Sequence, residues 1–210
     1  MQVIAVAVVL LVVVGAGIWW QLSRSAVTVE DAGASAPAEL LDDGVAVGTA
    51  DAPVVEVYAD FLCPHCLELE ERLGATIDEL VTSGEARLVL HPVSFIDPTE
   101  SARSAAALGC AAETTSVLGF QRALFANAAG GFATERLVEV ATATGLDDDV
   151  VQCVRDEAQL EWAAAVDTAA RDRGVGGTPT IFVDGEELPI EQTADPAMFL
   201  AAFAELTATP

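Results

Sequence analysis

Apolar and polar positions divide the chain into three regions. Residues 3–20 form a continuous apolar run that ends in two tryptophans, long enough to cross most of the hydrocarbon core of a bilayer. We therefore predict a transmembrane anchor, or an uncleaved signal, over residues 1–22. Residues 23–50 are rich in Ala, Ser, Asp and Glu and have little periodicity, which predicts an acidic flexible linker. The remaining residues, 51–210, are enough for one folded domain.

Within this domain, short β-branched runs alternate with longer helical patterns, so the predicted fold class is α/β. A buried strand over residues 53–59 leads into a helix that continues toward residue 80, and a second strand covers residues 86–93. Helical spacing then predicts a helical stretch with segments at 101–112, 117–126, 134–144, 149–158 and 160–173. Strands at 180–183 and 187–190 flank the hairpin signal Asp184-Gly185, and a closing helix covers 196–206.

The charge of the chain is strongly one-sided. Asp and Glu total 33 against nine Arg and no Lys, which gives a formal net charge of −24. Such a surface repels phosphate backbones and anionic lipid headgroups. Nucleic acid is therefore excluded as a partner.

Two cysteines separated by two residues stand where the first strand meets its helix. The motif is Cys63-Pro64-His65-Cys66. The first turn of a helix has unpaired N–H groups and a partial positive charge, which stabilise a thiolate over a thiol. Cys63 is therefore the expected nucleophile, and Cys66, one turn inside the helix, is the expected resolving thiol. His65 can lower the pKa of Cys63 further through a hydrogen bond or a positive charge.

A zinc site and a purely structural disulfide are two alternative interpretations of this motif. Zinc needs four ligands and usually a second closely spaced pair, whereas Cys110, Cys153 and His91 are isolated in the sequence. We therefore predict no metal. A structural bridge across two residues would close a very short loop and stabilise little.

The segment from Tyr58 to Cys66 resembles the active site of DsbA-like proteins of the thioredoxin superfamily, whose oxidase members carry the same Pro-His dipeptide. A second segment, residues 174–185, resembles the cis-proline loop of that family and the strand that follows it. The resemblance implies a cis peptide bond at Pro179, facing the cysteine pair and leaving a backbone edge free for an extended substrate. Thr178 occupies the neighbouring position, which tunes redox potential in this superfamily. The implied fold is thioredoxin-like, with an inserted helical subdomain at about residues 98–173.

Cys110 and Cys153 both fall in that insertion, on different predicted helices. With 42 residues between them, a bridge would constrain the unfolded chain by about 4 kcal/mol in the chain-entropy account. We expect a structural disulfide, which some relatives of DsbA carry in this subdomain. The alternative is two buried, unpaired thiols that behave as small hydrophobic side chains.

One position departs from the family pattern. DsbA-like proteins commonly bury an acid beneath the cysteine pair, six residues before the first cysteine, and here that residue is Val57. Glu56 is adjacent, but strand alternation points it to the opposite sheet face, so a role as proton relay would need a bulge. Asp60 could modulate the pKa of Cys63 or cap the helix.

The resemblance implies a thiol–disulfide oxidoreductase that introduces disulfides into exported proteins with free thiols, through Cys63 and Cys66 and without a bound cofactor. Its electron acceptor would be a quinone-linked membrane oxidase of the DsbB or vitamin K epoxide reductase type. We expect a single-pass protein of the cell membrane with an extracytoplasmic catalytic domain. Two alternatives stay open: a disulfide reductase or isomerase of the same fold, and a peptide-binding, chaperone-like module whose disulfide is not catalytic.

Overall fold

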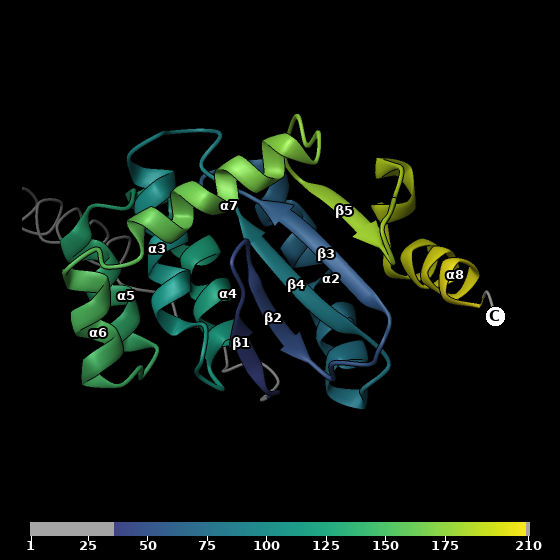
Figure 1. Ribbon diagram of the computed structural model, residues 1–210, viewed down its shortest axis with the longest axis horizontal. Helices are drawn as coiled ribbons and strands as arrows, with labels where there is room; N and C mark the ends of the chain where they lie inside the picture. The colour runs from purple at the N-terminus through teal and green to yellow at the C-terminus, as the bar shows by residue number, and fades with distance from the viewer. Residues whose placement is uncertain (1–35, 209–210) are drawn as a thin grey trace, which may run out of the picture.

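One six-stranded sheet organises the protein. Figure 1 shows its computed structural model, which describes residues 36–208. The strand order is β1-β2-β4-β3-β5-β6. The strands are β1 Ala38–Leu40, β2 Val45–Gly48, β3 Val54–Ala59, β4 Arg87–Pro92, β5 Thr180–Val183 and β6 Glu186–Glu187. Only β3 and β4 pair in parallel, in the centre of the sheet, and the outer pairs are antiparallel.

The sheet begins earlier in the chain than the sequence predicted. Residues 38–48 were expected in the linker, but β1 and β2 form a hairpin, and β2 pairs with β4. Val45 and Val47 are completely or almost completely buried in the main core, so this short apolar run completes the sheet. The linker boundary at residue 50 is therefore wrong, and the folded unit includes residues 38–50.

The membrane segment predicted over residues 1–22 lies outside the described residues. Within residues 36–208, no helix combines the length and the apolar character that a bilayer crossing needs.

Helices cover both faces of the sheet. Helix α2 (Pro64–Ser83) and helix α8 (Pro196–Thr207) lie on one face, where apolar side chains of α2 pack on Val55, Val57, Leu88 and Leu90 in the main core. Helix α7 (Leu160–Asp172) crosses the other face, in front of the sheet in Figure 1. There Val166 and Ala170 pack with Tyr58 and Phe182 in a second core. The alternation along β3 therefore sends Val57 and Tyr58 to different faces.

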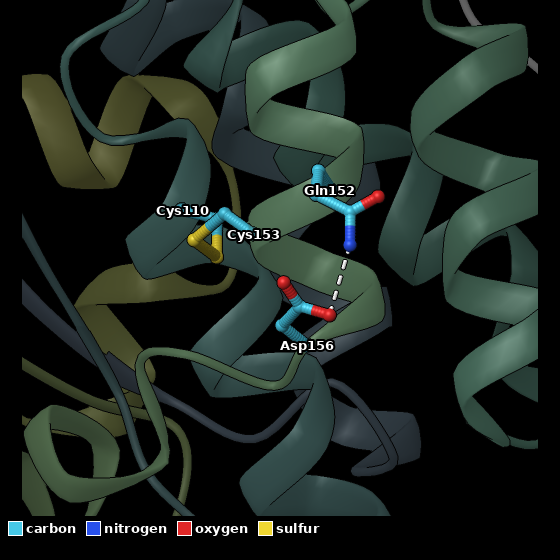
Figure 2. The surroundings of a disulfide bond; sticks show 4 residues. All are labelled: Cys110, Gln152, Cys153 and Asp156. Carbon is cyan, nitrogen blue, oxygen red and sulfur yellow. Dashed lines mark hydrogen bonds between the residues drawn. A yellow bond between two sulfur atoms is a disulfide. The ribbon is translucent and has the colours of Figure 1, made fainter.

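The helical insertion matches the sequence prediction closely. Its helices are α3 (Glu100–Ala111), α4 (Val117–Asn127), α5 (Thr134–Ala143), α6 (Asp148–Arg155) and α7, with the 3₁₀ turn η1 at Ala128–Gly130. A disulfide joins Cys110 of α3 to Cys153 of α6, with their Cα atoms 5.8 Å apart (Figure 2). The predicted pairing is thus confirmed, and the alternative of two unpaired thiols is wrong.

The C-terminal hairpin is shorter than predicted. Asp184 and Gly185 both have positive φ, 46° and 86°, as a tight two-residue hairpin turn requires. The strand expected at 187–190 is limited to the two residues of β6, because Pro189 lacks the N–H that would extend the ladder. A 3₁₀ turn, η2 (Ile190–Thr193), follows. Both edge strands of the sheet, β1 and β6, are consequently very short, with three and two residues.

Candidate active site

The cysteine pair lies at the junction of β3 and α2, where the sequence placed it. Cys63 is the N-cap of α2 and Pro64 is its first residue, a position that proline favours because its missing N–H would be unpaired there anyway. A turn joins strand and helix, since the Cys63 N–H donates to the Asp60 carbonyl at 3.0 Å. The Cys63 carbonyl accepts from the N–H groups of Cys66 and Leu67. Local chain geometry thus fixes both thiols at the start of the helix.

Both thiols are free and buried, with 4% of Cys63 and 1% of Cys66 exposed. Burial raises the pKa of the Cys66 thiol to about 12, although hydrogen bonds from the Asp60 backbone and the Thr178 side chain offset part of the rise. A thiol in this condition stays protonated at neutral pH. It forms a thiolate only when a base removes its proton.

Thr178 lies against the pair, and the peptide bond that joins it to Pro179 is cis, as expected from the sequence. The Cys63 Sγ donates to the Thr178 carbonyl oxygen at 3.5 Å, while the Thr178 hydroxyl group bonds to Cys66. Two segments that are more than 100 residues apart in the chain therefore meet at the two sulfur atoms.

A groove of about 430 Å³ opens beside this junction. Its walls come from the first turns of α2, the cis-proline loop and η2, through the residues His65, Glu68, Arg72, Thr178, Pro179 and Ile190. Ile190 is 57% exposed and offers an apolar contact at the edge of the groove. The sequence prediction missed Arg72 and Ile190, because only the folding of η2 toward α2 brings them together.

His65 does not contact the Cys63 sulfur as the sequence suggested. Its side chain is 73% exposed and its Nδ1 lies 3.3 Å from the Glu68 carboxylate, one turn further along α2. Glu68 also lies 3.8 Å from Arg72, so the three side chains form a polar row on the groove wall. The spacing of three and four residues along a helix favours these pairs and directs the imidazole away from the thiol.

Asp60 neither caps α2 nor faces the sulfur atoms with its carboxylate. The residue is completely buried, and its carboxylate accepts hydrogen bonds from the N–H groups of Leu62, Phe95 and Ile96 and from the Ser101 hydroxyl. Helix α2 has no side-chain cap. The carboxylate therefore ties the segment before Cys63 to the loop that opens the helical insertion.

Glu56 lies on the sheet face opposite the cysteines. Pairing of β3 with β4 continues without a bulge from Val54 to Ala59, so Glu56 cannot turn toward the pair. Its carboxylate pairs with Arg173 and lies 3.9 Å from His91 Nε2. The bulge that a relay role of Glu56 would need is therefore absent from β3, and Glu56 lies on the face that strand alternation predicted. Val57 does face the cysteines, in the main core.

The sequence prediction missed one carboxylate that lies on the same side of the sheet as the cysteines. Glu70 lines a small cavity that also borders Cys66 and Val57. The signal was the spacing Cys66 to Glu70, one helical turn on one face of α2. Across residues 36–208, no three His, Cys, Asp or Glu side chains are arranged as metal ligands.

This arrangement defines a class of protein: a thioredoxin fold that presents a dithiol at a helix N-terminus against a cis-proline loop. A thioredoxin family model matches residues 41–200, and the chain belongs to that family. Within it the chain is a DsbA-like thiol–disulfide oxidoreductase, as two structural neighbours of 29% identity indicate, a DsbA and a disulfide bond oxidoreductase from Mycobacterium tuberculosis.

Three solved structures illustrate the likeness. Reduced DsbA from Mycobacterium tuberculosis is 29% identical with a TM-score of 0.67, covering 80% of this chain and 93% of that chain. MdbA from Corynebacterium diphtheriae, described as a thiol-disulfide oxidoreductase, is 22% identical with a TM-score of 0.69, covering 81% and 98%. Oxidised BdbD from Bacillus subtilis is 16% identical with a TM-score of 0.68, covering 82% and 97%. The latter two support the fold alone. No curated protein matches the chain.

Proposed function

We propose that the Cys63–Cys66 pair introduces disulfide bonds into exported proteins that carry free thiols. The observation that supports this most directly is the position of Cys63, which is the N-cap of α2 and donates to the carbonyl beside the cis-proline. A nucleophilic sulfur is thereby set at the one point where an extended chain can meet both the helix N-terminus and a free backbone edge.

The reaction begins from the disulfide form of the pair. A substrate thiolate attacks the Cys63 sulfur, the Cys63–Cys66 bond breaks, and Cys66 leaves with the electron pair and then takes up a proton. A second substrate thiolate attacks the substrate sulfur of the mixed disulfide and releases Cys63 as a thiolate. The substrate loses two electrons and gains one disulfide. The reduced pair with free thiols is the product state of this reaction.

The groove beside Pro179 is the proposed substrate site. Proline has no N–H, so the backbone of the cis-proline loop can pair with an extended segment instead of a neighbouring strand. Thr178 and Pro179 form the backbone side of the groove, and His65 and Arg72 form the helix side. Ile190 offers an apolar contact to an unfolded chain.

Each cycle leaves a reduced pair, so an electron acceptor must reoxidise it. We propose a quinone-linked membrane oxidase of the DsbB or vitamin K epoxide reductase type as that acceptor. The apolar run at residues 3–20 supports an anchor over residues 1–22 that would keep the domain beside such a partner, outside the cytoplasm. Residues between this anchor and β1 would serve as the tether.

The reduction potential of the Cys63–Cys66 pair tests the direction of electron flow. We expect a value near about −120 mV against glutathione, which characterises strong disulfide donors. In parallel, Cys63→Ala should abolish oxidation of a reduced, unfolded protein. Cys66→Ala, once oxidised glutathione has converted its Cys63 to a mixed disulfide with glutathione, should exchange that glutathione for a substrate with a single thiol and hold the substrate as a mixed disulfide. A potential near about −270 mV would refute disulfide donation and support a reductase.

A further inference from the structure

A small cavity lies beneath Cys66, between α2, the central strands and the insertion. Its volume is about 30 Å³, and most of its walls are apolar, including Val57, Leu69 and Phe125. The groups on its walls that can exchange or share protons include the Cys66 thiol, the Glu70 carboxyl and the Gln121 amide. The space is large enough for about one or two water molecules.

An unpaired polar atom of Gln121 offers a hydrogen-bonding site for water in this cavity. Gln121 is only 7% exposed, and its Nε2 donates to Glu70 Oε2 at 2.8 Å. Its Oε1 is buried and has no hydrogen-bond partner within the described protein. A buried carbonyl oxygen is rarely left unpaired, and a water in a polar pocket is the usual partner. A water bonded to Gln121 Oε1 would stand in the same cavity as the Cys66 sulfur.

Glu70 is built into the other end of this cavity. A Cβ atom at Gly74 would lie 2.6 Å from Glu70 Oε1, so a glycine inside α2 makes the room that the carboxyl occupies. A glycine inside a helix lowers the stability of the fold by about 0.5–1 kcal/mol relative to alanine. At position 74 the glycine leaves the space that the Glu70 carboxyl occupies. The Glu70 side chain remains 16% exposed, whereas Cys66 is 1% exposed. Glu70 therefore reaches bulk water and Cys66 does not.

The charges around Glu70 set its protonation. Burial raises the pKa of the Glu70 carboxyl, and the Arg122 guanidinium and the Gln121 hydrogen bond partly offset the rise. Arg122 Nε lies 3.6 Å from Glu70, and the same guanidinium pairs with Asp78. His91 also borders the cavity, but its ring stacks on Tyr58 on the opposite sheet face. No other titratable side chain lines it within residues 36–208 besides Cys66 and Asp78.

We propose that Glu70 is the proton relay of Cys66, acting through water in this cavity. The assignment rests on the proposed function. It supplies the buried acid that is missing from this chain at Val57. When the pair closes, the Glu70 carboxylate takes the Cys66 proton through the water. The Cys66 thiolate attacks the Cys63 sulfur of a mixed disulfide, and the bound thiol leaves with the electron pair of the broken bond. In disulfide donation the same carboxyl, protonated, returns its proton to the departing Cys66 thiolate.

The closing step can be measured directly in the full reduced protein. Oxidised glutathione reacts first with Cys63, and Cys66 then closes the pair and releases glutathione. Acid quenching and mass spectrometry follow both steps. We expect Glu70→Gln, which keeps the size of the side chain, to slow closure at least about tenfold at pH 7 and to leave the first step unchanged. Glu71→Gln is the matched control, because Glu71 is an exposed acid next along α2.

The pH profile separates a proton relay from a structural role. With Glu70→Gln, closure should rise about tenfold for each pH unit, as for deprotonation by hydroxide, and the wild-type profile should be flatter. Equal closure rates and equal profiles in wild type and Glu70→Gln would overturn the proposal.

A second variant covers the case in which Glu70→Gln does not fold. Gln121→Met keeps the volume but removes the carbonyl that would hold the water, and it should slow closure in the same direction; closure at the wild-type rate would count against the water path. If the wild-type protein itself does not react with oxidised glutathione, the proposed function fails. If it reacts and both variants close normally, only the relay is wrong.

Discussion

Thr178 contacts both sulfur atoms, through two different groups of the same residue. Its backbone carbonyl accepts from Cys63, and its side chain bonds to Cys66. Side-chain substitution can therefore change the environment of Cys66 while the contact with Cys63 stays in place. At the residue scale, a substitution of the Thr178 side chain can therefore distinguish the role of Cys66 from that of Cys63.

We predict that Thr178→Val slows closure of the pair by Cys66 without slowing the first attack by Cys63. Loss of one hydrogen bond of about 1 kcal/mol corresponds to about a fivefold slower step, because the Cys66 thiolate loses a donor that lowers its pKa. Stopped-flow oxidation by glutathione measures both steps. Thr180→Val, two residues further, is the control, since the Thr180 hydroxyl bonds to the Gly177 carbonyl instead. Equal slowing by both variants would contradict the prediction.

At the scale of elements, two cross-links hold the helical insertion in place. The Asp60 carboxylate joins the active-site segment to the loop before α3, through Phe95, Ile96 and Ser101. The disulfide joins α3 to α6, and the Trp162 indole of α7 donates to the Leu41 carbonyl in the N-terminal hairpin at 2.7 Å. The Asp60 and Trp162 contacts thus fix the insertion to the rest of the domain at two places, and the disulfide ties two of its own helices together. The position of the thiols depends directly on the Asp60 cross-link.

The disulfide is expected to stabilise the whole fold. With a sequence separation of 43 residues, its removal in a Cys110→Ala, Cys153→Ala double variant should lower the free energy of unfolding by about 4 kcal/mol, because the unfolded chain regains loop entropy. Urea denaturation measures the loss. The Cys63→Ala, Cys66→Ala variant is the control, since that pair is already open in the reduced protein. An equal loss in both variants would show that the bridge adds nothing beyond the packing of its sulfurs.

Regular elements were predictable because they depend on long local patterns. The helix after Cys66 and the helices of the insertion follow from apolar spacing along the chain, and the structure places them within a few residues of the prediction. β1 and β2 were missed because three or four residues carry almost no periodic signal. β2 is recognisable only from its pairing with β4.

The cysteine pair was predictable in the same way, but the roles of the acids near it were not. Apart from the local Leu62 N–H, the donors to Asp60 lie at least 35 residues away, and the Gln121 amide that holds Glu70 is 51 residues distant. Glu56 could be placed correctly on the opposite face, because strand alternation is local. Which acid lies beneath the thiols depends on tertiary contacts such as that with Gln121, in addition to the helical spacing of Cys66 and Glu70.

At the scale of the whole molecule, a polar cluster is buried in the second core, on the sheet face opposite the thiols. The His91 ring stacks on Tyr58 with centroids 4.1 Å apart, and its Nδ1 lies 2.6 Å from the Asp43 carbonyl. Burial lowers the pKa of His91, and the neighbouring Asp43 and Glu56 offset only part of this effect. The folded protein therefore binds a proton at His91 less readily than the unfolded chain does.

This cluster makes stability depend on pH. Because the folded pKa of His91 lies below its unfolded value of 6.5, its contribution is complete above about pH 6.5 and is lost as the pH falls below it. We predict a slope of up to about 1.4 kcal/mol per pH unit just below pH 6.5, measured by urea denaturation between pH 5 and 7.5. His91→Gln should flatten this slope. His65→Gln, which changes the exposed histidine, should keep it; the reverse result would contradict the assignment.

The two short edge strands of the sheet affect how this protein interacts with unfolded chains. A catalyst of disulfide formation works among chains that have not yet folded. Such chains expose segments that can pair with the unpaired backbone groups of an edge strand. Edge strands of three and two residues offer these segments very few backbone groups to pair with. Under the proposed function, substrate chains would instead be held at the groove beside Pro179 and through one exchangeable disulfide bond to Cys63. The short edge strands therefore protect the protein from co-aggregation with unfolded chains.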